Sequence, residues 1–465
     1  MKKTITLLMA YLCLSVSHAQ AQNAPITEQV TLHVATAGTL QDMIDPSIRP
    51  LITNLKLTGK LNGDDLLIIR EMAGADRYGN PTQGYALETL DISEATIVPF
   101  GDSYVTVYRV VTLGNVSTTY EYIYETNRYE RYSTDGLSYT WGDNYGLDYL
   151  FYQCKNIKKV KLPEYFGDGY SKERTPWANG TFIGCTSLTS VELPERVTKL
   201  SDAFIGCTSL TTIDLPESVE FLDGTFKGCT SLTTIDLPES VSSLDSTFYG
   251  CTSLTSIDLP ESVRKLNGTF KGCTSLTSID LPESVSSLNG TFKDCTSLTT
   301  IDLPESVEYL NGTFKGCTSL TTIDLPESVS SLDSTFYGCT SLTSVNMLGD
   351  NALYLGNTFK DCPNLRAIRL FSPIPSIPRE FPELSDNVTI YVPKGSYMSY
   401  RVTGWGAYNL MEFDAVGIDT PVRTNKAGVP EYYSIEGKLL TSPQRGVNIV
   451  READGTTKKV FIQRP

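Results

Sequence analysis

The chain contains a block of 22 residues that recurs almost unchanged from about Cys185 to Cys339, and one copy reads CTSLTSIDLPESVRKLNGTFKG. Self-similarity at this period predicts a solenoid, because so small a unit buries its apolar face only by stacking on its neighbours. The run Gly224 to Ser256 is identical to Gly312 to Ser344. This identity indicates block duplication. Such duplication favours a long molecule with a large surface over a molecule with one unique pocket.

The apolar positions within one repeat predict how each unit folds. In one copy they are Leu210, Ile213, Leu215, Val219, Leu222, Phe226 and Cys229. Ile213 and Leu215 face inward with Asp214 outward between them, as a strand requires, and Pro216 then ends the strand. Stacking therefore predicts a parallel sheet along one face. The Asn-Gly and Asp-Gly pairs predict turns or short 3₁₀ segments elsewhere in the repeat.

These residues carry a resemblance to a known family. The L-x-x-I-x-L-P, S-V, L, F-x-x-C and T-S-L elements resemble the BspA-like leucine-rich repeats of bacterial surface proteins, over about residues 150–393. Weaker echoes at LITNLKL and LETLDIS suggest that the solenoid begins earlier. Residues 388–408 resemble the family's C-terminal cap, with a final strand followed by Tyr397, Tyr400 and Trp405. The resemblance implies an α/β, β-rich leucine-rich repeat solenoid with capped ends.

The sequence predicts five segments. Lys2 and Lys3, an apolar stretch and small residues before Asn23 are typical of a secretory signal. The segments are a signal peptide (1–22), an N-terminal cap with repeat-like strands and a tyrosine-rich insertion (23–149), the repeats (150–393), a C-terminal cap (394–416) and a linker with a β segment (417–465).

The last segment has two interpretations. Gly437, Gly446, Ile449 and Val450 lie in a stretch that resembles the C-terminal export or sorting segment of Bacteroides-group surface proteins. The alternative is a small appended β-hairpin domain.

Charge and hydropathy narrow the classes of partner. The net charge is −15, and removal of a signal that carries two lysines and no acid lowers it to −17. Nucleic acid is disfavoured, because binding a phosphate backbone needs clustered Lys and Arg. Cationic surfaces and metal ions are the natural electrostatic partners. No segment after the signal approaches the length of a transmembrane span.

The cysteines and histidines argue against catalysis. Eight cysteines from Cys185 to Cys339 lie 22 residues apart, in one column of the expected solenoid. Rungs about 4.8 Å apart hold the sulfurs beyond bonding distance, so buried free thiols are expected rather than disulfides. The mature chain has one histidine, His33, and no metal-ligand or cofactor-binding motif, so neither a metal site nor a cofactor is expected. Adjacent carboxylates match the spacing of a retaining glycosidase, but identical rungs supply one repeated environment. The chain is predicted not to be an enzyme.

Two acidic columns follow from the repeat. The outward strand position and the position after the strand-ending proline each carry a carboxylate in successive repeats. The candidate ligand-binding residues are Asp214, Asp236, Asp258, Asp280, Asp302 and Asp324 in the first column and Glu217, Glu239 and Glu261 in the second. One interpretation is a solvated face whose aspartates accept hydrogen bonds from Thr and Ser hydroxyls. The other is a surface for a cationic partner or for calcium, which takes carboxylate oxygens.

Two insertions interrupt the repeats. The stretch from Tyr104 to Tyr152 holds 11 of the 26 tyrosines, and TTYEYIYET alternates as a β-hairpin does. A loop at residues 165–177 lengthens one repeat. Tyr120, Tyr122 and Tyr124 are candidate ligand contacts, because tyrosine offers a large contact area at low entropy cost. The alternative is a hairpin that only thickens the N-terminal end.

The sequence therefore predicts an exported bacterial leucine-rich repeat protein, secreted or held at the cell surface and outer membrane. Its expected function is adhesion to a host extracellular matrix protein, a glycan or another cell, with calcium as a further candidate partner. The alternatives are a structural surface protein without a specific ligand and, as a distant third, a glycan-processing enzyme.

Overall fold

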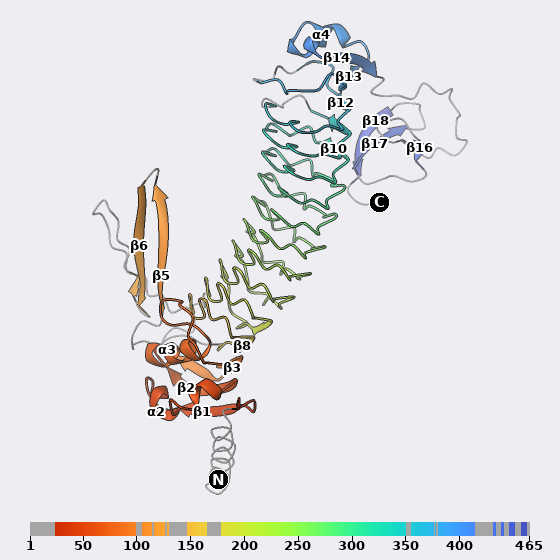
Figure 1. Ribbon diagram of the computed structural model, residues 1–465. Helices are drawn as coiled ribbons and strands as arrows, with labels where there is room; N and C mark the ends of the chain where they lie inside the picture. Colours follow the sequence, from red (N-terminus) through yellow and green to blue (C-terminus); the bar gives the residue numbers. More distant parts are fainter. Residues whose placement is uncertain are drawn as a thin grey trace. The chain divides into compact units, whose positions relative to one another are not determined.

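The structure is a computed structural model of the chain (Figure 1). Backbone and side chains are described for residues 24–98, 147–164, 178–349, 355–375, 377 and 380–413. Backbone pairing alone is described for the strands at residues 105–113, 116–125, 128–129, 431–433, 439–440, 446–451 and 457–462. The chain divides into two compact units: the first is Met1–Val263 with Thr269–Thr274, and the second is Arg264–Gly268 with Ser275–Pro465.

The first unit begins with a parallel sheet. Its strands are hydrogen-bonded in the order β1 (Val30–Val34), β2 (Asn54–Leu61), β3 (Thr89–Asp91), β8 (Lys159–Lys161) and β9 (Ser190–Glu192), while β4 (Ala95–Ile97) pairs with the end of β2. The register aligns Leu55, Leu90, Val160 and Val191, which are all buried. The LITNLKL and LETLDIS segments therefore belong to the solenoid, as expected.

Helices are few and lie outside the repeats. The first unit has α2 (Leu40–Met43), η1 (Arg49–Leu51) and α3 (Gly63–Met72). The start of α3 is held by a capping box, in which the Asn62 side chain accepts from backbone N–H groups and the Asp65 side chain accepts from the Asn62 N–H. The sequence analysis did not anticipate α3.

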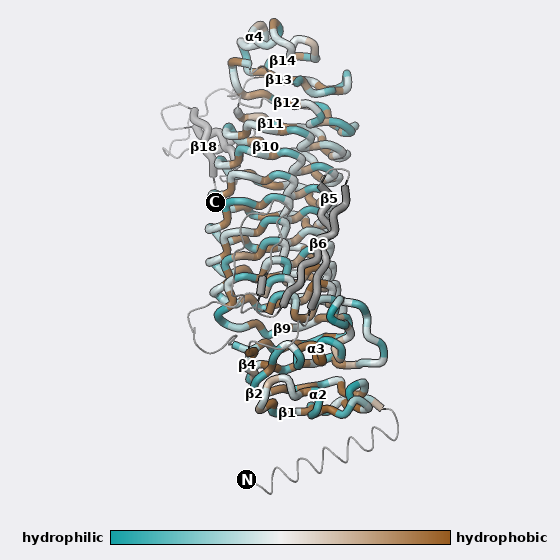
Figure 2. Tube along the Cα trace, turned by 90° about the vertical axis from the view of Figure 1, so that its left-hand side faces the viewer, coloured by the Kyte–Doolittle hydropathy of each residue, from teal (hydrophilic) through white to brown (hydrophobic). Residues whose placement is uncertain are grey.

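The repeats form columns of identical side chains in each unit. Hydrophobic residues recur at the same place in successive turns (Figure 2). In the first unit the rings of Phe226 and Phe248 stack with centroids 5.7 Å apart and an interplanar angle of 8°. In the second unit Phe314 and Phe336 stack at 5.7 Å and 4°. Each of these phenylalanines is fully buried, which contributes on the order of 1.5–3 kcal/mol per ring.

Polar columns inside the core are satisfied from one rung to the next. The Thr225 hydroxyl donates to the Leu200 carbonyl at 2.9 Å, and the Cys229 thiol donates to the Phe204 carbonyl at 3.1 Å. The cysteines of the described residues are free, and all are buried except the half-buried Cys362, as expected. Burial raises the pKa of the Cys229 thiol to about 12. These thiols pack as small apolar groups.

The second unit ends in a five-stranded parallel sheet. Its order is β10 (Thr322–Leu325), β11 (Ser344–Met347), β12 (Ala367–Leu370), β13 (Thr389–Pro393) and β14 (Asn409–Phe413), with α4 (Tyr397–Arg401) and η2 (Gly404–Ala407) between the last two strands. Tyr400 and Trp405 are buried there, and the Tyr400 hydroxyl donates to the Ser372 carbonyl at 2.8 Å. The expectation that β13 is the final strand is wrong, because β14 adds one more in parallel.

Two antiparallel elements accompany the solenoid. The tyrosine-rich insertion forms the expected hairpin from β5 (Val105–Leu113) and β6 (Val116–Glu125), with β7 (Arg128–Tyr129) beside β6. The tail forms a sheet from β15 (Glu431–Tyr433), β16 (Leu439–Leu440), β17 (Gly446–Arg451) and β18 (Thr457–Ile462). The signal at 1–22, the loop at 165–177 and the linker at 417–430 lie outside the described residues. No helix in the described part is long and apolar enough to span a membrane.

Arg70 joins α3 to the first repeat through backbone carbonyls. Its side chain is fully buried, and its guanidinium donates to the carbonyls of Leu150 at 2.7 Å, Asp76 at 2.7 Å and Tyr152 at 3.1 Å. The fork of a guanidinium reaches several acceptors at once, which an ammonium group cannot do. One arginine therefore supplies the donor for the Leu150 and Tyr152 carbonyls, while the Asp76 carbonyl also accepts from the Gly79 N–H.

We predict that Arg70→Met destabilises the first unit by about 3 kcal/mol or more, because the buried Leu150 carbonyl and the part-buried Tyr152 carbonyl lose their donor. Urea unfolding followed by circular dichroism measures this change. Arg196→Met, at an exposed position of the same unit, is the matched control and should shift the unfolding free energy by less than about 0.5 kcal/mol. Equal effects of the two substitutions would contradict the role of Arg70.

Asp148 is a buried carboxyl at the first repeat, and it accepts a hydrogen bond from the Asn179 N–H at 2.8 Å. Burial raises the pKa of Asp148 to about 6, against the lowering effects of the Asn179 hydrogen bonds and the Lys199 charge. Between pH 4 and 6 the folded chain therefore retains a proton that the unfolded chain has lost. The contribution of Asp148 to the free energy of unfolding therefore falls as the pH rises from 4 to 6 and is constant above pH 6.

We predict that Asp148→Asn raises the free energy of unfolding relative to the unmodified chain, and that this difference grows by up to about 3 kcal/mol from pH 4 to pH 7. Urea unfolding at the two pH values measures it. Asp42→Asn, at an exposed position, controls for the loss of one negative charge. An equal effect of Asp148→Asn at both pH values would refute the raised pKa.

Candidate functional site

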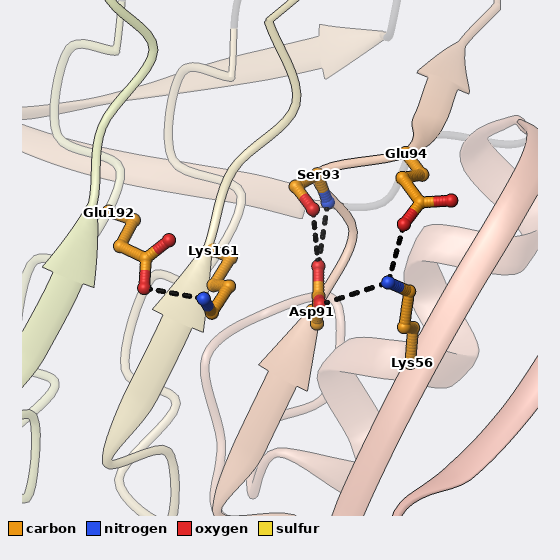
Figure 3. A network of polar contacts seen from close by, with 6 residues as sticks. All are labelled: Lys56, Asp91, Ser93, Glu94, Lys161 and Glu192. Atoms are coloured by element: carbon orange, nitrogen blue, oxygen red, sulfur yellow. Dashed lines mark hydrogen bonds and ion pairs between the residues drawn. The ribbon is translucent and has the colours of Figure 1, made fainter.

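The outward position of the strands carries alternating charges at the start of the first unit (Figure 3). Lys56 Nζ lies 2.6 Å from Glu94 Oε1 and 3.5 Å from Asp91 Oδ2, and Lys161 Nζ lies 2.6 Å from Glu192 Oε1. Burial raises the pKa of Asp91, but hydrogen bonds from Ser93 and the charge of Lys56 outweigh it and hold the pKa below its usual value. At this position Lys56 thus has Asp91 and Glu94 as opposite neighbours, and Lys161 has Glu192.

The same position becomes uniformly acidic in the following repeats. Asp214, Asp236 and Asp258 of the first unit are exposed, and so are Asp280 and Asp302 of the second. Within the described part of the chain, no ion pair or hydrogen bond is recorded for the side chains of Asp214, Asp236 or Asp258. The interpretation in which Thr and Ser hydroxyls donate to the aspartates is therefore wrong for these three. We call the six aspartates from Asp214 to Asp324 the aspartate column.

Strand pairing is lost where carboxylates face each other. Between β9 and β10 the described residues carry no strand, although the sequence predicts one in every repeat. Three residues before the outward acidic position, a threonine N–H donates to a carbonyl of the preceding rung. This hydrogen bond is 2.8 Å long from Thr189 to the Lys158 carbonyl, where the outward charges are opposite. It is 3.2 Å from Thr233 to Thr211 and 3.4 Å from Thr255 to Thr233. Like charges about 5 Å apart cost on the order of 1 kcal/mol in water, which is enough to loosen a marginal ladder.

Pairing returns in the second unit where the column ends in an amide. The Asn346 Nδ2 group donates to Asp324 Oδ1 at 2.6 Å, and the Arg369 guanidinium lies 5.4 Å from the centre of the Tyr391 ring. Strands β10 to β13 run through these residues, and the bond from Thr343 N–H to the Thr321 carbonyl is again 2.8 Å. Strand pairing is thus present where a neutral donor, Asn346, lies beside the last carboxylate of the column, Asp324.

The second acidic column lies three residues after the aspartate column in each repeat, and the tyrosines lie in the hairpin that precedes the repeats. Glu217, Glu239 and Glu261 are exposed after the strand-ending prolines. Tyr120, Tyr122 and Tyr124 occupy alternate positions of β6, paired with Arg109, Val107 and Val105 of β5.

Two clusters of lysine and tyrosine were missed by the sequence analysis. In the first unit Lys227 and Lys271 lie over the ring of Tyr249, with Nζ 5.0 and 4.9 Å from its centre. In the second unit Lys315 and Lys360 lie over the ring of Tyr337 at 4.4 and 5.9 Å. We call these the first and second triads. The signal was available, because the residue after the core phenylalanine is one of the few that vary between repeats.

No three side chains of His, Cys, Asp or Glu among the described residues gather closely enough to hold a metal ion. His33 lies on β1, and its Nδ1 is 2.9 Å from the Thr58 hydroxyl.

We predict that Asp236→Asn stabilises the first unit by about 1 kcal/mol, because it removes like-charge repulsion from both neighbouring aspartates and supplies an amide donor. The pair of Asn346 and Asp324 is the natural precedent. Urea unfolding measures the change. Asp42→Asn, at an exposed position of the same unit outside the repeats, gives the same change of charge. A gain no larger than that of Asp42→Asn would contradict the argument from repulsion.

Comparison with known proteins gives a family match. A family model described as the BspA type leucine rich repeat region matches in six copies over residues 147–269 and 266–388. No curated protein matches the chain.

Solved structures of repeat proteins are also similar. A leucine-rich repeat protein of T. pallidum is 34% identical, with 35% of this chain and 77% of that chain covered and a TM-score of 0.32. A leucine-rich repeat protein from Bacteroides ovatus is 20% identical, with 66% and 98% covered and a TM-score of 0.30. The pneumococcal vaccine antigen PcpA is 15% identical, with 78% and 80% covered and a TM-score of 0.40.

Proposed function

The chain belongs to the BspA-type leucine-rich repeat family, and from this premise we propose that it is an exported bacterial surface protein that functions by binding. Its partner is a host extracellular matrix protein, a glycan or another cell. The proposed contact surface is the aspartate column, together with Glu217, Glu239 and Glu261.

The observation that carries this proposal is the contrast between the column and its flanks. Lys56 is ion-paired with Asp91, and Lys161 with Glu192. Asp214, Asp236 and Asp258, in contrast, are exposed and have no ion pair or hydrogen bond among the described residues. The repulsion between them is unfavourable in the isolated chain. A cationic partner relieves this repulsion. The loss of repulsion between the carboxylates therefore contributes to the free energy of binding.

Repetition favours an extended partner over a small ligand. Each exposed charge pair contributes only about 0.2–1 kcal/mol, which is too little for specific binding alone. A column that repeats once per rung lets many such contacts add along a fibrous protein or a glycan chain. Calcium is a further candidate, because it takes carboxylate oxygens and could bridge the column to an anionic partner.

Two other functions predict different behaviour. A structural surface protein without a specific ligand shows no saturable affinity for matrix proteins or glycans. A glycan-processing enzyme shows turnover. The hairpin residues Tyr120, Tyr122 and Tyr124 offer a second contact surface for the same binding function.

The test is binding of the purified full chain to immobilised matrix proteins and glycans, with and without calcium. We expect saturable binding that weakens at least tenfold when Asp214, Asp236 and Asp258 are replaced together by Asn. Replacement of Asp223, Asp245 and Asp333 by Asn removes the same charge at turn positions, where other repeats carry Asn, and is the matched control. That control should bind as the unmodified chain does.

Each other outcome has a definite meaning. Binding that survives the column variant but is lost when Tyr120, Tyr122 and Tyr124 are replaced by Ala would place the contact on the hairpin. Absence of binding to every partner, with and without calcium, would refute the adhesive function and favour the structural one.

A further inference from the structure

The second triad holds a carboxylate of its own. Asp361 directly follows Lys360, and the Tyr337 hydroxyl donates a hydrogen bond to its side chain. This hydrogen bond and the nearby negative charge raise the pKa of Tyr337. The tyrosine whose ring lies near two ammonium groups in the second triad thus also has an anionic acceptor for its hydroxyl.

The first triad lacks that carboxylate. Its third member lies in the run Phe270-Lys271-Gly272-Cys273, which corresponds to Phe359-Lys360-Asp361-Cys362 in the second triad. Gly272 has no side chain. No hydrogen bond of the Tyr249 hydroxyl and no ion pair of Lys227 or Lys271 is recorded among the described residues. The first triad therefore has the same Lys-Tyr-Lys arrangement as the second but lacks the carboxylate that Asp361 supplies there.

The backbone at the two positions is alike, so the difference lies in the side chain. Gly272 has φ +75° and Asp361 has φ +59°, and Asp294 occupies the same place of another repeat with φ +63°. A Cβ on Gly272 would meet the Cα and N of Gly250 at 3.7 and 3.8 Å, which are ordinary contacts. Aspartate is thus compatible with this turn, although left-handed backbone favours glycine.

We propose that the first triad is an interaction surface for the aspartate column of a second copy of this chain. The Tyr249 hydroxyl donates to one carboxylate, as Tyr337 does to Asp361, and the ammonium groups of Lys227 and Lys271 pair with the carboxylates on either side. The function is self-association, and it does not depend on any host ligand.

The spacing of the two surfaces favours a second copy over another acidic partner. The triad takes one residue from each of three successive rungs, whose phenylalanine rings are 5.7 and 5.6 Å apart. Asp214, Asp236 and Asp258 take one carboxylate from each of three successive rungs of the same unit. The triad and the aspartate column both take one residue from each rung, so their spacing is the same. Three carboxylates of one copy therefore come into register with Lys227, Tyr249 and Lys271 of the other. An unrelated anionic partner would have to match this spacing independently.

The net charge of −15 does not prevent the contact. At physiological ionic strength, repulsion between exposed charges is largely screened beyond about 8 Å, so the groups at the contact decide the sign of the interaction. The triad of one copy meets the column of another, so the contact is heterologous and leaves one free surface of each kind. Such contacts continue into open rows of molecules.

The test is sedimentation of the full chain over a range of concentrations at 0.15 M salt. We expect the average mass of the unmodified chain to rise with concentration. Gly272→Asp supplies the missing carboxylate and should weaken association at least tenfold. Gly84→Asp adds the same charge at another left-handed turn of the same unit, where the new Cβ meets no atom within 4 Å, and should associate as the unmodified chain does. Asp361→Gly removes the carboxylate from the second triad, which leaves its tyrosine and lysines available to a second copy, and should strengthen association.

Mixing two variants tests the identity of the partner. One variant is Gly272→Asp, which keeps the aspartate column, and the other replaces all six aspartates of the column by Asn and keeps the triad. Each alone should remain monomeric, and an equimolar mixture should form a one-to-one complex. If Gly272→Asp does not fold, Lys227→Gln with Lys271→Gln replaces it.

Three results would overturn the proposal. They are an unmodified chain that stays monomeric at every concentration, association that Gly272→Asp leaves unchanged, and a mixture of the two variants that forms no complex. The first would overturn self-association even if the triad bound an acidic polysaccharide. No host molecule enters this test, so its result is separate from that of the adhesion assay.

Discussion

The stacking of near-identical rungs requires each side chain to lie against its own kind. In the core this requirement is favourable: phenylalanine stacks on phenylalanine, as in the pair of Phe226 and Phe248 at 5.7 Å, and each Thr or Cys finds the carbonyl of the rung before it. On the surface the same requirement sets carboxylate against carboxylate. The core can therefore extend indefinitely, whereas the outer face accumulates repulsion with every repeat.

This opposition explains which parts of the fold could be predicted from the sequence. The buried positions follow from the spacing of apolar residues within one repeat, and the structure buries Ile213, Leu222, Phe226 and Cys229 as expected. Strand pairing depends on the neighbouring rung as well, so a strand-like LTTIDL segment pairs beside Asn346 and fails to pair between aspartates. A pattern read within one repeat does not contain that information.

The surfaces were harder to predict for the same reason. The acidic columns are visible because one residue type recurs in every repeat, whereas a triad combines three residues that lie in three different repeats. Lys227, Tyr249 and Lys271 are unremarkable in sequence and meet only through rung stacking. The helix α3, the buried Arg70 and the extra strand β14 lie outside the periodic pattern, where spacing gives no guidance.

The duplication accounts for the resemblance and the difference of the two triads. The identical blocks Gly224 to Ser256 and Gly312 to Ser344 each contain the first two members, Lys227 with Tyr249 and Lys315 with Tyr337. The third member lies beyond the block in both cases, and there the copies diverge into Lys271-Gly272 and Lys360-Asp361. A single residue outside the duplicated segment thus decides whether the tyrosine hydroxyl already has a carboxylate or faces outward without one.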